Sequence, residues 1–371
     1  MASKTIAPVA RAGGKIHVQG DKSISHRSII LGALSVAPCT VDNFLVAEDC
    51  LCTLEAFRQM GVPIERDGTR VRIQGRGLEG LKAPTKPIWC GNSGTFTRLF
   101  MGVMTGQPFA VQLEGDPSLS SRPMARVMDP LTKMGAFFPP NATRLPLTMR
   151  GAHTVHSLQW TSAVASAQVK SAILLAGLYA SGITEVKEPT LSRDHTERML
   201  AASGVKIERD GAHVKLYGTA TIRATHFSVP NDLSSAAFFL AAGLLASPEG
   251  IEVGNVGINP TRTGFLDIVA GMNGAIARHQ ATEKSGEPVA ALTAKKSALR
   301  GMTIDGALVP RAIDEFPILT VLATQAQGQT VISGAEELRV KEADRISKVA
   351  QELTKMGARI KIGRASCRER V

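Results

Sequence analysis

A repeated pattern of helix end, glycine and strand constrains the fold of this chain more than any other feature. At five places an apolar helix end meets a glycine and then a β-rich run. The glycines are Gly61, Gly135, Gly204, Gly274 and Gly357. We expect each to end its helix, because a left-handed backbone at that point suits glycine. The period of about 70–80 residues is longer than that of solenoids, and it predicts a series of supersecondary repeats.

Each repeat also contains a second, more apolar helix ahead of its glycine. These helices are predicted to begin near Lys22, Ser93, Ser166, Leu233 and Asp314. Apolar side chains cover nearly all faces of 171–180 and 235–246, so we expect both helices to be buried. Asp67-Gly68 and Asp210-Gly211 are hairpin-turn dipeptides between β-rich runs. The repeat is therefore predicted to be βαβαββ.

The predicted fold class is α/β, in the α+β sense, with two domains for a chain of 371 residues. Five repeats are visible, and the fifth reaches one strand, Ala358 to Ile362. The charged stretch 363–371 has no strand alternation, and we expect it to be a non-native tail.

The composition is that of a globular, enzyme-sized protein, and its positive charge indicates an anionic ligand. The net charge of +11 first suggests nucleic acid, but the basic residues are dispersed and aromatic residues make up only 4%. Anionic small molecules explain the charge at least as well. The sequence has no run of membrane-spanning length and no apolar signal core, and its cysteine count of 5 is odd. We expect a cytoplasmic protein with free thiols, no metal, no membrane and no nucleic acid.

The first candidate site lies between a short predicted strand, 15–19, and the first apolar helix. Lys22, Ser23 and Arg27 place two cations and a hydroxyl at that helix N-terminus. Free N–H groups and the helix dipole favour an oxyanion there. The alternative is an ordinary capped helix with solvated basic residues.

Polar residues also gather at the starts of the later helices and in the loops before them. These segments are Asn92 to Thr95 with Arg98, Ser121 to Pro123, Ser166 to Lys170, Ser192 to His195, Asp314-Glu315 and Arg339 to Arg345. Each could be simple capping or a solvated helix face. For His195 we favour a capped surface residue. Together they predict a shared polyanion site.

Several of these segments, in order along about 13–360, resemble the signatures of the 5-enolpyruvylshikimate-3-phosphate synthase family (3-phosphoshikimate 1-carboxyvinyltransferases). The matching segments are Gly20 to Arg27, Gly91 to Arg98, Ser121 to Arg126, Ser166 to Lys170, Asn259 to Arg262 and Arg339 to Arg345.

The resemblance implies a two-domain inverse βα-barrel of six βαβαββ repeats, of which five are present. One domain would comprise 1–20 plus 241–362 and the other 21–240, with the active site in the cleft between them. The sixth repeat, with an arginine that binds phosphoenolpyruvate, would be missing at the C-terminus. We therefore expect a C-terminally truncated protein, partly folded and with little activity.

The resemblance also assigns roles to single residues. Shikimate 3-phosphate would be bound by Lys22, Ser23, Arg27, Ser166, Ala167, Gln168, Arg193, Asp314 and Lys341. Phosphoenolpyruvate would be bound by Lys22, Asn92, Gly94, Thr95, Arg122, Gln168 and Arg345. The acid and base candidates are Asp314, Glu342 and Lys22.

The implied reaction transfers the enolpyruvyl group of phosphoenolpyruvate to the 5-hydroxyl of shikimate 3-phosphate and releases phosphate, in aromatic amino acid biosynthesis. It needs no cofactor, glyphosate would inhibit it, and the enzyme would be a monomer. The nearest alternative is a UDP-N-acetylglucosamine enolpyruvyl transferase, which typically has Lys-Asn where this chain has Lys22-Ser23. The alternative from another functional class is an RNA-binding or RNA-modifying protein built from the same βαβαββ repeats.

Overall fold

The chain passes back and forth between two units. The computed structural model describes residues 5, 7, 12–219, 221–340, 343–363 and 369–370. Unit 1 comprises 1–18, 231–282 and 288–371, and unit 2 comprises 19–230 and 283–287. We expected the boundary between the two domains near residue 240, which lies inside α8 (Leu233–Ala246). The whole of α8 instead belongs to unit 1. The chain therefore changes unit ahead of α8 rather than within it.

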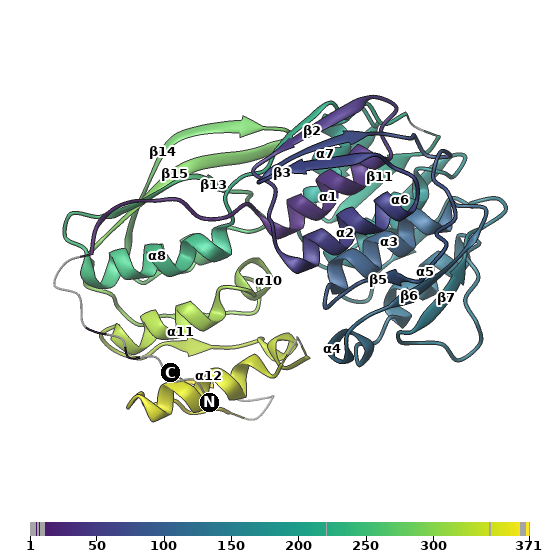
Figure 1. Ribbon diagram of the computed structural model, residues 1–371. Helices are drawn as coiled ribbons and strands as arrows, with labels where there is room; N and C mark the ends of the chain where they lie inside the picture. The colour runs from purple at the N-terminus through teal and green to yellow at the C-terminus, as the bar shows by residue number, and fades with distance from the viewer. Residues whose placement is uncertain are drawn as a thin grey trace. The chain divides into compact units, whose positions relative to one another are not determined.

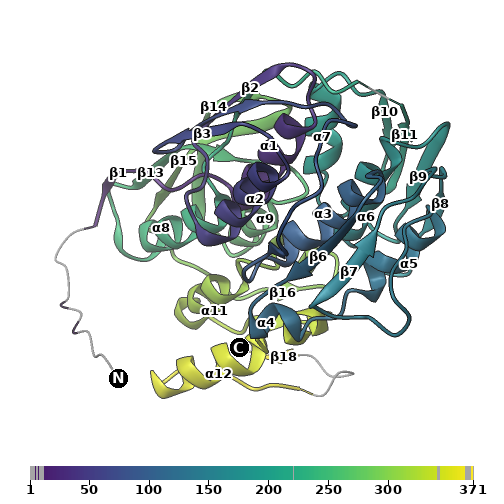
Figure 2. The same cartoon turned by 45° about the vertical axis from the view of Figure 1, so that its right-hand side comes forward.

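Unit 2 contains seven helices among the described residues. They are α1 (Lys22–Ala33), α2 (Glu48–Gln59), α3 (Gly94–Thr105), α4 (Pro117–Ser120), α5 (Ala125–Lys133), α6 (Ala167–Gly177) and α7 (His195–Ala202). Of these, α1, α3 and α6 form most of the interior of the unit. Every residue of α1 from Ile24 is buried, as is every residue of α6 from Val169, so the expected burial of that helix is confirmed. Figures 1 and 2 show α3 and α6 side by side at the centre of this unit.

Three sheets surround these helices, one for each repeat. Their strand orders are β12-β2-β4-β3, β5-β6-β7 and β10-β11-β9-β8. The strands are β2 (Pro38–Asp42), β3 (Ile64–Asp67), β4 (Arg70–Gln74), β5 (Ile88–Trp89), β6 (Ala110–Glu114), β7 (Leu147–Arg150), β8 (Gln159–Thr161), β9 (Ile183–Lys187), β10 (Ile207–Asp210), β11 (His213–Tyr217) and β12 (His226–Ser228). Each sheet has one parallel pair, and its other pairs are antiparallel. Helices inside and sheets outside are the inverse arrangement that we predicted.

The first strand of two repeats comes from a distant part of the chain. β12 pairs in parallel with β2 and completes the first sheet of unit 2. β1 (Gly14–Ile16) instead pairs in parallel with β13 (Ile251–Gly257) of unit 1. The N-terminal strand and the repeat that follows it therefore belong to different units.

Unit 1 packs helices against a four-stranded sheet, β1-β13-β15-β14, completed by β14 (Ala275–Lys284) and β15 (Glu287–Lys295). Figure 1 shows α8 next to this sheet, with α11 beyond α8 and α12 beyond α11. The remaining elements are α9 (Gly264–Gly271), β16 (Thr303–Ile304), α10 (Val309–Ala312), α11 (Phe316–Gln325), β17 (Val331–Ile332), the 3₁₀ helix η1 (Glu336–Val340), α12 (Arg345–Lys355) and β18 (Glu369–Arg370). Among the described residues, none of the helices has both the length and the apolar character to cross a membrane.

Three expectations for unit 1 are wrong. α8 is not buried on all faces, because Phe238 and Phe239 are 56% and 41% exposed. Residues Ala358 to Ile362 form no strand and contain only one bridge residue, Lys361. The stretch 363–371 was expected to lack a strand, but it contains β18, which pairs antiparallel with β17. β18 depends on a partner strand from elsewhere in the chain, which the local pattern does not reveal.

Four of the five repeat glycines have the expected left-handed backbone: Gly61, Gly135, Gly204 and Gly357 have φ between +81° and +108°. In the fourth repeat this conformation falls one residue early, on Asn273 with φ 63°. α9 is capped by Met272, so Asn273 is the first residue beyond the helix end. Asparagine tolerates this region, so the helix ends there without glycine.

We predict that Gly204→Ala lowers the free energy of unfolding by about 1 kcal/mol, because a Cβ is strained at positive φ. No heavy atom lies within 4 Å of the added Cβ, so no steric clash contributes. Gly254→Ala is the matched control, since its Cβ also meets open space but its φ is not positive. Denaturant unfolding of both variants measures the difference, and equal stabilities would contradict the assignment.

Candidate active site

The N-terminus of α1 carries the first group of candidate residues. Asp21 caps the helix by accepting a hydrogen bond from the Ile24 N–H at 2.9 Å. Lys22 is half exposed, and its Nζ lies 3.2 Å from the Asp49 carboxylate. Ser23 is partly buried, and its carbonyl accepts from Arg27. The helix end thus offers a half-exposed cation, Lys22, and a buried one, Arg27.

Arg27 is buried and held by three hydrogen bonds. Its Nε donates to Thr196 Oγ1 at 2.6 Å, one terminal nitrogen to the Ser23 carbonyl at 2.9 Å and the other to Ser171 Oγ at 2.9 Å. Burial lowers its pKa to about 10, so the guanidinium still carries its charge at neutral pH. A guanidinium has five N–H groups, so two remain to donate to an anion.

His26, the neighbour of Arg27, ties α1 to α2 and α3. Its Nδ1 lies 2.7 Å from Thr53 Oγ1, and its Nε2 lies 3.3 Å from the hydroxyl of Ser93, the N-cap of α3. Burial, with the nearby charges of Lys22 and Arg27, lowers the pKa of His26 to about 3. A neutral imidazole therefore fixes the start of two site helices relative to each other.

The N-terminus of α3 brings together most of the residues expected to bind phosphoenolpyruvate. Arg122 donates to Asn92 Oδ1 and, at 3.3 Å, to Ser118 Oγ. Gln168, at the start of α6, donates from Nε2 to Thr95 Oγ1 at 3.0 Å. A Cβ on Gly94 would lie 3.3 Å from Arg122. The starts of α3 and α6 and the loop before α5 thus meet at one place.

Arg98 completes this group, although no substrate role was expected for it. It donates to Gln168 Oε1 at 2.7 Å and to the Gly94 carbonyl at 3.3 Å. Because an arginine can only donate, the amide of Gln168 must present its oxygen to Arg98 and its nitrogen to Thr95. The signal was present in the sequence as a cation one helical turn after the Asn92 to Thr95 segment.

A buried ion cluster lies beneath the start of α6. Lys170 Nζ is 2.8 Å from Glu188 and 2.8 Å from Glu197, and all three side chains are almost wholly buried. Although burial opposes it, the two carboxylates raise the pKa of Lys170, while burial raises the pKa of Glu197. Sequence reasoning missed both glutamates, because nothing in the local pattern separates them from solvated surface residues.

The structure places Ser166 at the N-cap of α6, followed by Ala167 as its first residue. Arg193 lies in the loop before α7 and is close enough to lower the pKa of Arg27. His195, expected to be a capped surface residue, is instead buried, with Nδ1 2.8 Å from the Glu287 carboxylate. Glu287 lies 92 positions away in the sequence, so the residues around His195 could not predict this contact.

In unit 1, Asp314 lies between two arginines. Its carboxylate accepts from Arg345 at 3.1 Å and from Arg262 at 3.2 Å. Arg262 is nearly buried and also donates to Ser234 Oγ at 2.8 Å. Two guanidiniums at this distance stabilise the ionised carboxylate and fix its direction. Lys341 and Glu342, the other two candidates in this segment, lie outside the described residues.

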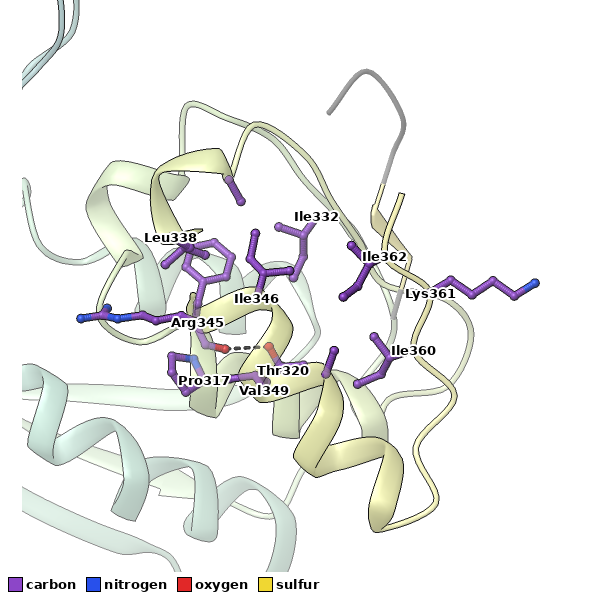
Figure 3. Close-up of a pocket in the computed structure, with 13 residues that line it drawn as sticks. Pro317, Thr320, Ile332, Leu338, Arg345, Ile346, Val349, Ile360, Lys361 and Ile362 are labelled. Atoms are coloured by element: carbon purple, nitrogen blue, oxygen red, sulfur yellow. Dashed lines mark hydrogen bonds between the residues drawn. The ribbon is translucent and has the colours of Figure 1, made fainter. Parts of the chain in front are cut away.

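A pocket of unit 1 has a mainly apolar lining, and of the Asp314 cluster only Arg345 contributes to it. Figure 3 shows Ile332, Ile346, Ile360 and Ile362 facing one another, with the charged ends of Arg345 and Lys361 directed away from them. The apolar side chains that face one another offer an anion no donors. The oxyanion chemistry therefore belongs to the helix N-termini and not to this pocket.

No group of three or more His, Cys, Asp or Glu suited to a metal ion occurs within the described part of the chain. Cys50 and Cys52 lie on α2, and both are free thiols, as expected. Burial raises the pKa of the Cys52 thiol to about 11, so it is protonated at neutral pH.

We predict that His26→Gln flattens the acid side of the stability profile. The unfolded chain binds a proton on His26 below its ordinary pKa of 6.5, whereas the folded protein does not until about 3. The free energy of unfolding therefore decreases as the pH is lowered through this window, by up to about 1.4 kcal/mol per pH unit. Denaturant unfolding at several pH values between 4 and 6.5 measures the slope. The exposed His156, replaced likewise, controls for loss of a histidine in general, and an unchanged slope in His26→Gln would contradict the assignment.

Comparison with known proteins gives one consistent answer. The family model for EPSP synthase (3-phosphoshikimate 1-carboxyvinyltransferase) matches residues 6–370. The 3-phosphoshikimate 1-carboxyvinyltransferases of Bacillus thuringiensis and Citrifermentans bemidjiense are 48% and 50% identical to this chain, each match covering 97% of the chain and 84% of the relative. A solved EPSP synthase from Acinetobacter baumannii is 44% identical with a TM-score of 0.87, over 96% of this chain and 81% of that one. The chain therefore belongs to the EPSP synthase family.

Proposed function

We propose that this chain transfers the enolpyruvyl group of phosphoenolpyruvate to the 5-hydroxyl of shikimate 3-phosphate and releases phosphate. The observation that carries the proposal is the meeting of the N-termini of α1, α3 and α6 in unit 2, each with cations or amide and hydroxyl donors. Converging helix N-termini suit substrates that both carry phosphate. Phosphate release from phosphoenolpyruvate, with and without shikimate 3-phosphate, tests the proposal directly.

Shikimate 3-phosphate would bind at the starts of α1 and α6. Arg27 has two N–H groups left for its phosphate, and Lys22 and Arg193 add further positive charge. Ser23, Ser166, Ala167 and Gln168 would complete the site for the phosphate and ring, with Asp314 and Lys341 on the ring hydroxyls.

Phosphoenolpyruvate would bind at the start of α3. The Asn92 to Thr95 turn and Arg122 would hold its phosphate or carboxylate, with Gln168, Lys22 and Arg345 as further ligands. Arg122 is held by Asn92 and Ser118, so its guanidinium is already oriented before the substrate arrives. Preorganised donors lose little entropy on binding.

The chemistry needs one group to take a proton and another to give one. The 5-hydroxyl loses its proton as its oxygen attacks C2 of phosphoenolpyruvate, while C3 gains a proton to become a methyl group. In the second step C3 loses a proton and phosphate leaves from C2, which restores the double bond. Asp314, Glu342 and Lys22 are the candidates for these transfers. Arginines on the departing phosphate would stabilise the charge it gains.

The alternatives from the sequence are not favoured. The family model and the relatives name EPSP synthase rather than a UDP-N-acetylglucosamine enolpyruvyl transferase or an RNA-binding protein. Inhibition by glyphosate, a monomeric state and a cytoplasmic location complete the proposal, and they rest on the family resemblance.

Lys22→Ala should weaken binding of shikimate 3-phosphate by about 1.5–3 kcal/mol, the usual worth of a hydrogen bond to a charged group. Titration calorimetry measures the loss. Lys15→Ala removes an exposed lysine that is also paired with a carboxylate, and it should bind normally. If both variants bind as the unmodified chain does, Lys22 is not a ligand.

Gly94→Ala should raise tolerance to glyphosate. The new Cβ would lie 2.7 Å from Arg98 and 3.3 Å from Arg122, so it must displace the guanidiniums that shape the phosphoenolpyruvate site. We expect a higher inhibitor constant in the phosphate-release assay, with Gly254→Ala as the control in open space. Equal inhibition of the two variants would refute the prediction.

A further inference from the structure

Glu188 connects two loops that carry anion-binding residues. It follows β9 directly, and its side chain is fully buried. One carboxylate oxygen accepts from the backbone N–H of Ser166 at 2.8 Å. The other accepts from the Ser192 hydroxyl at 2.7 Å and lies 2.8 Å from Lys170 Nζ. One carboxylate thus fixes the start of α6 to the loop before α7.

These contacts give the two serines different tasks. Ser192 uses both its hydroxyl and its backbone N–H on Glu188, so it anchors the loop that presents Arg193. Ser166 uses only its backbone N–H there, and its Oγ accepts a long bond, 3.4 Å, from the Val169 N–H. The Ser166 hydroxyl proton therefore stays available for a ligand, held in place by the bond to Glu188.

The charge of Glu188 is balanced within the protein. Two buried carboxylates beside a phosphate site would repel a dianion if they were uncompensated. Lys170 contacts both Glu188 and Glu197, and Arg27 is attracted by Glu197. The two cations cancel the two carboxylates. Arg193 and the N-terminus of α6 can then attract a bound phosphate without net repulsion from Glu188 and Glu197.

We propose that Glu188 is a positioning residue that sets the spacing of Ser166 and Arg193 for the 3-phosphate, and so makes the site prefer shikimate 3-phosphate over shikimate. This inference rests on the proposed function. Glu188 touches no reacting atom in this account and acts through the two loops.

Glu188→Gln tests the inference, since it keeps the size but replaces one acceptor oxygen by an NH₂ group. That group would face Lys170 or one of the serine donors, so at least one loop is released. We expect affinity for shikimate 3-phosphate to fall about 10–100-fold, while affinity for shikimate changes little. Titration calorimetry with both ligands measures the ratio. In steady state the KM for shikimate 3-phosphate should rise much more than kcat changes.

Glu185→Gln is the matched control. Glu185 lies on the same β-strand segment and is paired with His213 and Lys215, but it contacts neither loop. We expect it to keep the preference for the phosphorylated ligand. Ser192→Ala is the second variant, which leaves the Lys170 ion pairs intact and removes one hydroxyl from Glu188. It should weaken binding of shikimate 3-phosphate alone, by about 3–10-fold.

The outcomes separate the two proposals. If the unmodified chain binds shikimate 3-phosphate and Glu188→Gln keeps the preference, or loses affinity equally for both ligands, Glu188 is not a positioning residue although the function stands. If Glu188→Gln does not fold by circular dichroism, the ligand ratio of Ser192→Ala decides the question. If the unmodified chain binds no shikimate 3-phosphate, the proposed function fails and this inference fails with it.

Discussion

The buried contact of Lys170 with Glu188 and Glu197 is the interaction on which the rest of the site depends. Taking these charges out of water is costly, and the cost is offset only because each charge has a close partner. The geometry that satisfies them also fixes where α6 begins and how the chain approaches α7. Removing Lys170 or Glu188 would leave an uncompensated charge in the core. The two loops therefore keep their positions only while the whole cluster is intact.

A second constraint is the inverse layering of unit 2. Because α1, α3 and α6 are covered by sheets on their outer sides, their side chains must be apolar or internally satisfied. Their N-termini are where unpaired N–H groups remain, and those ends are therefore where polar residues gather. A fold that buries helices in this way generates anion sites at helix ends, and the catalytic residues are additions to a feature that the architecture already supplies.

Much of the fold could be predicted from the sequence because its signals are local. Gly61 and Gly204 end helices by their own backbone preference, and Asp67-Gly68 makes a hairpin turn with Gly68 at φ 54°. The errors concern residues whose environment is set by distant parts of the chain. Phe238 is exposed on an apolar helix, and His195 is buried by Glu287. Glu188 was missed as part of the site for the same reason, since it acts through Ser166, Lys170 and Ser192, partners that sequence spacing does not reveal.

The pairing of β1 with β13 has a consequence for the order in which the protein can form. β1 leaves the ribosome first, yet its partner strand begins at Ile251, after the main segment of unit 2 has been made. The two ends of that segment are joined by a hydrogen bond from the Asp21 N–H to the Pro230 carbonyl at 2.8 Å, so it can close on itself before β13 exists. At translation rates of about 5–20 residues per second, β1 waits on the order of 10–50 s without a partner. The first strand of the chain is among the last to be paired.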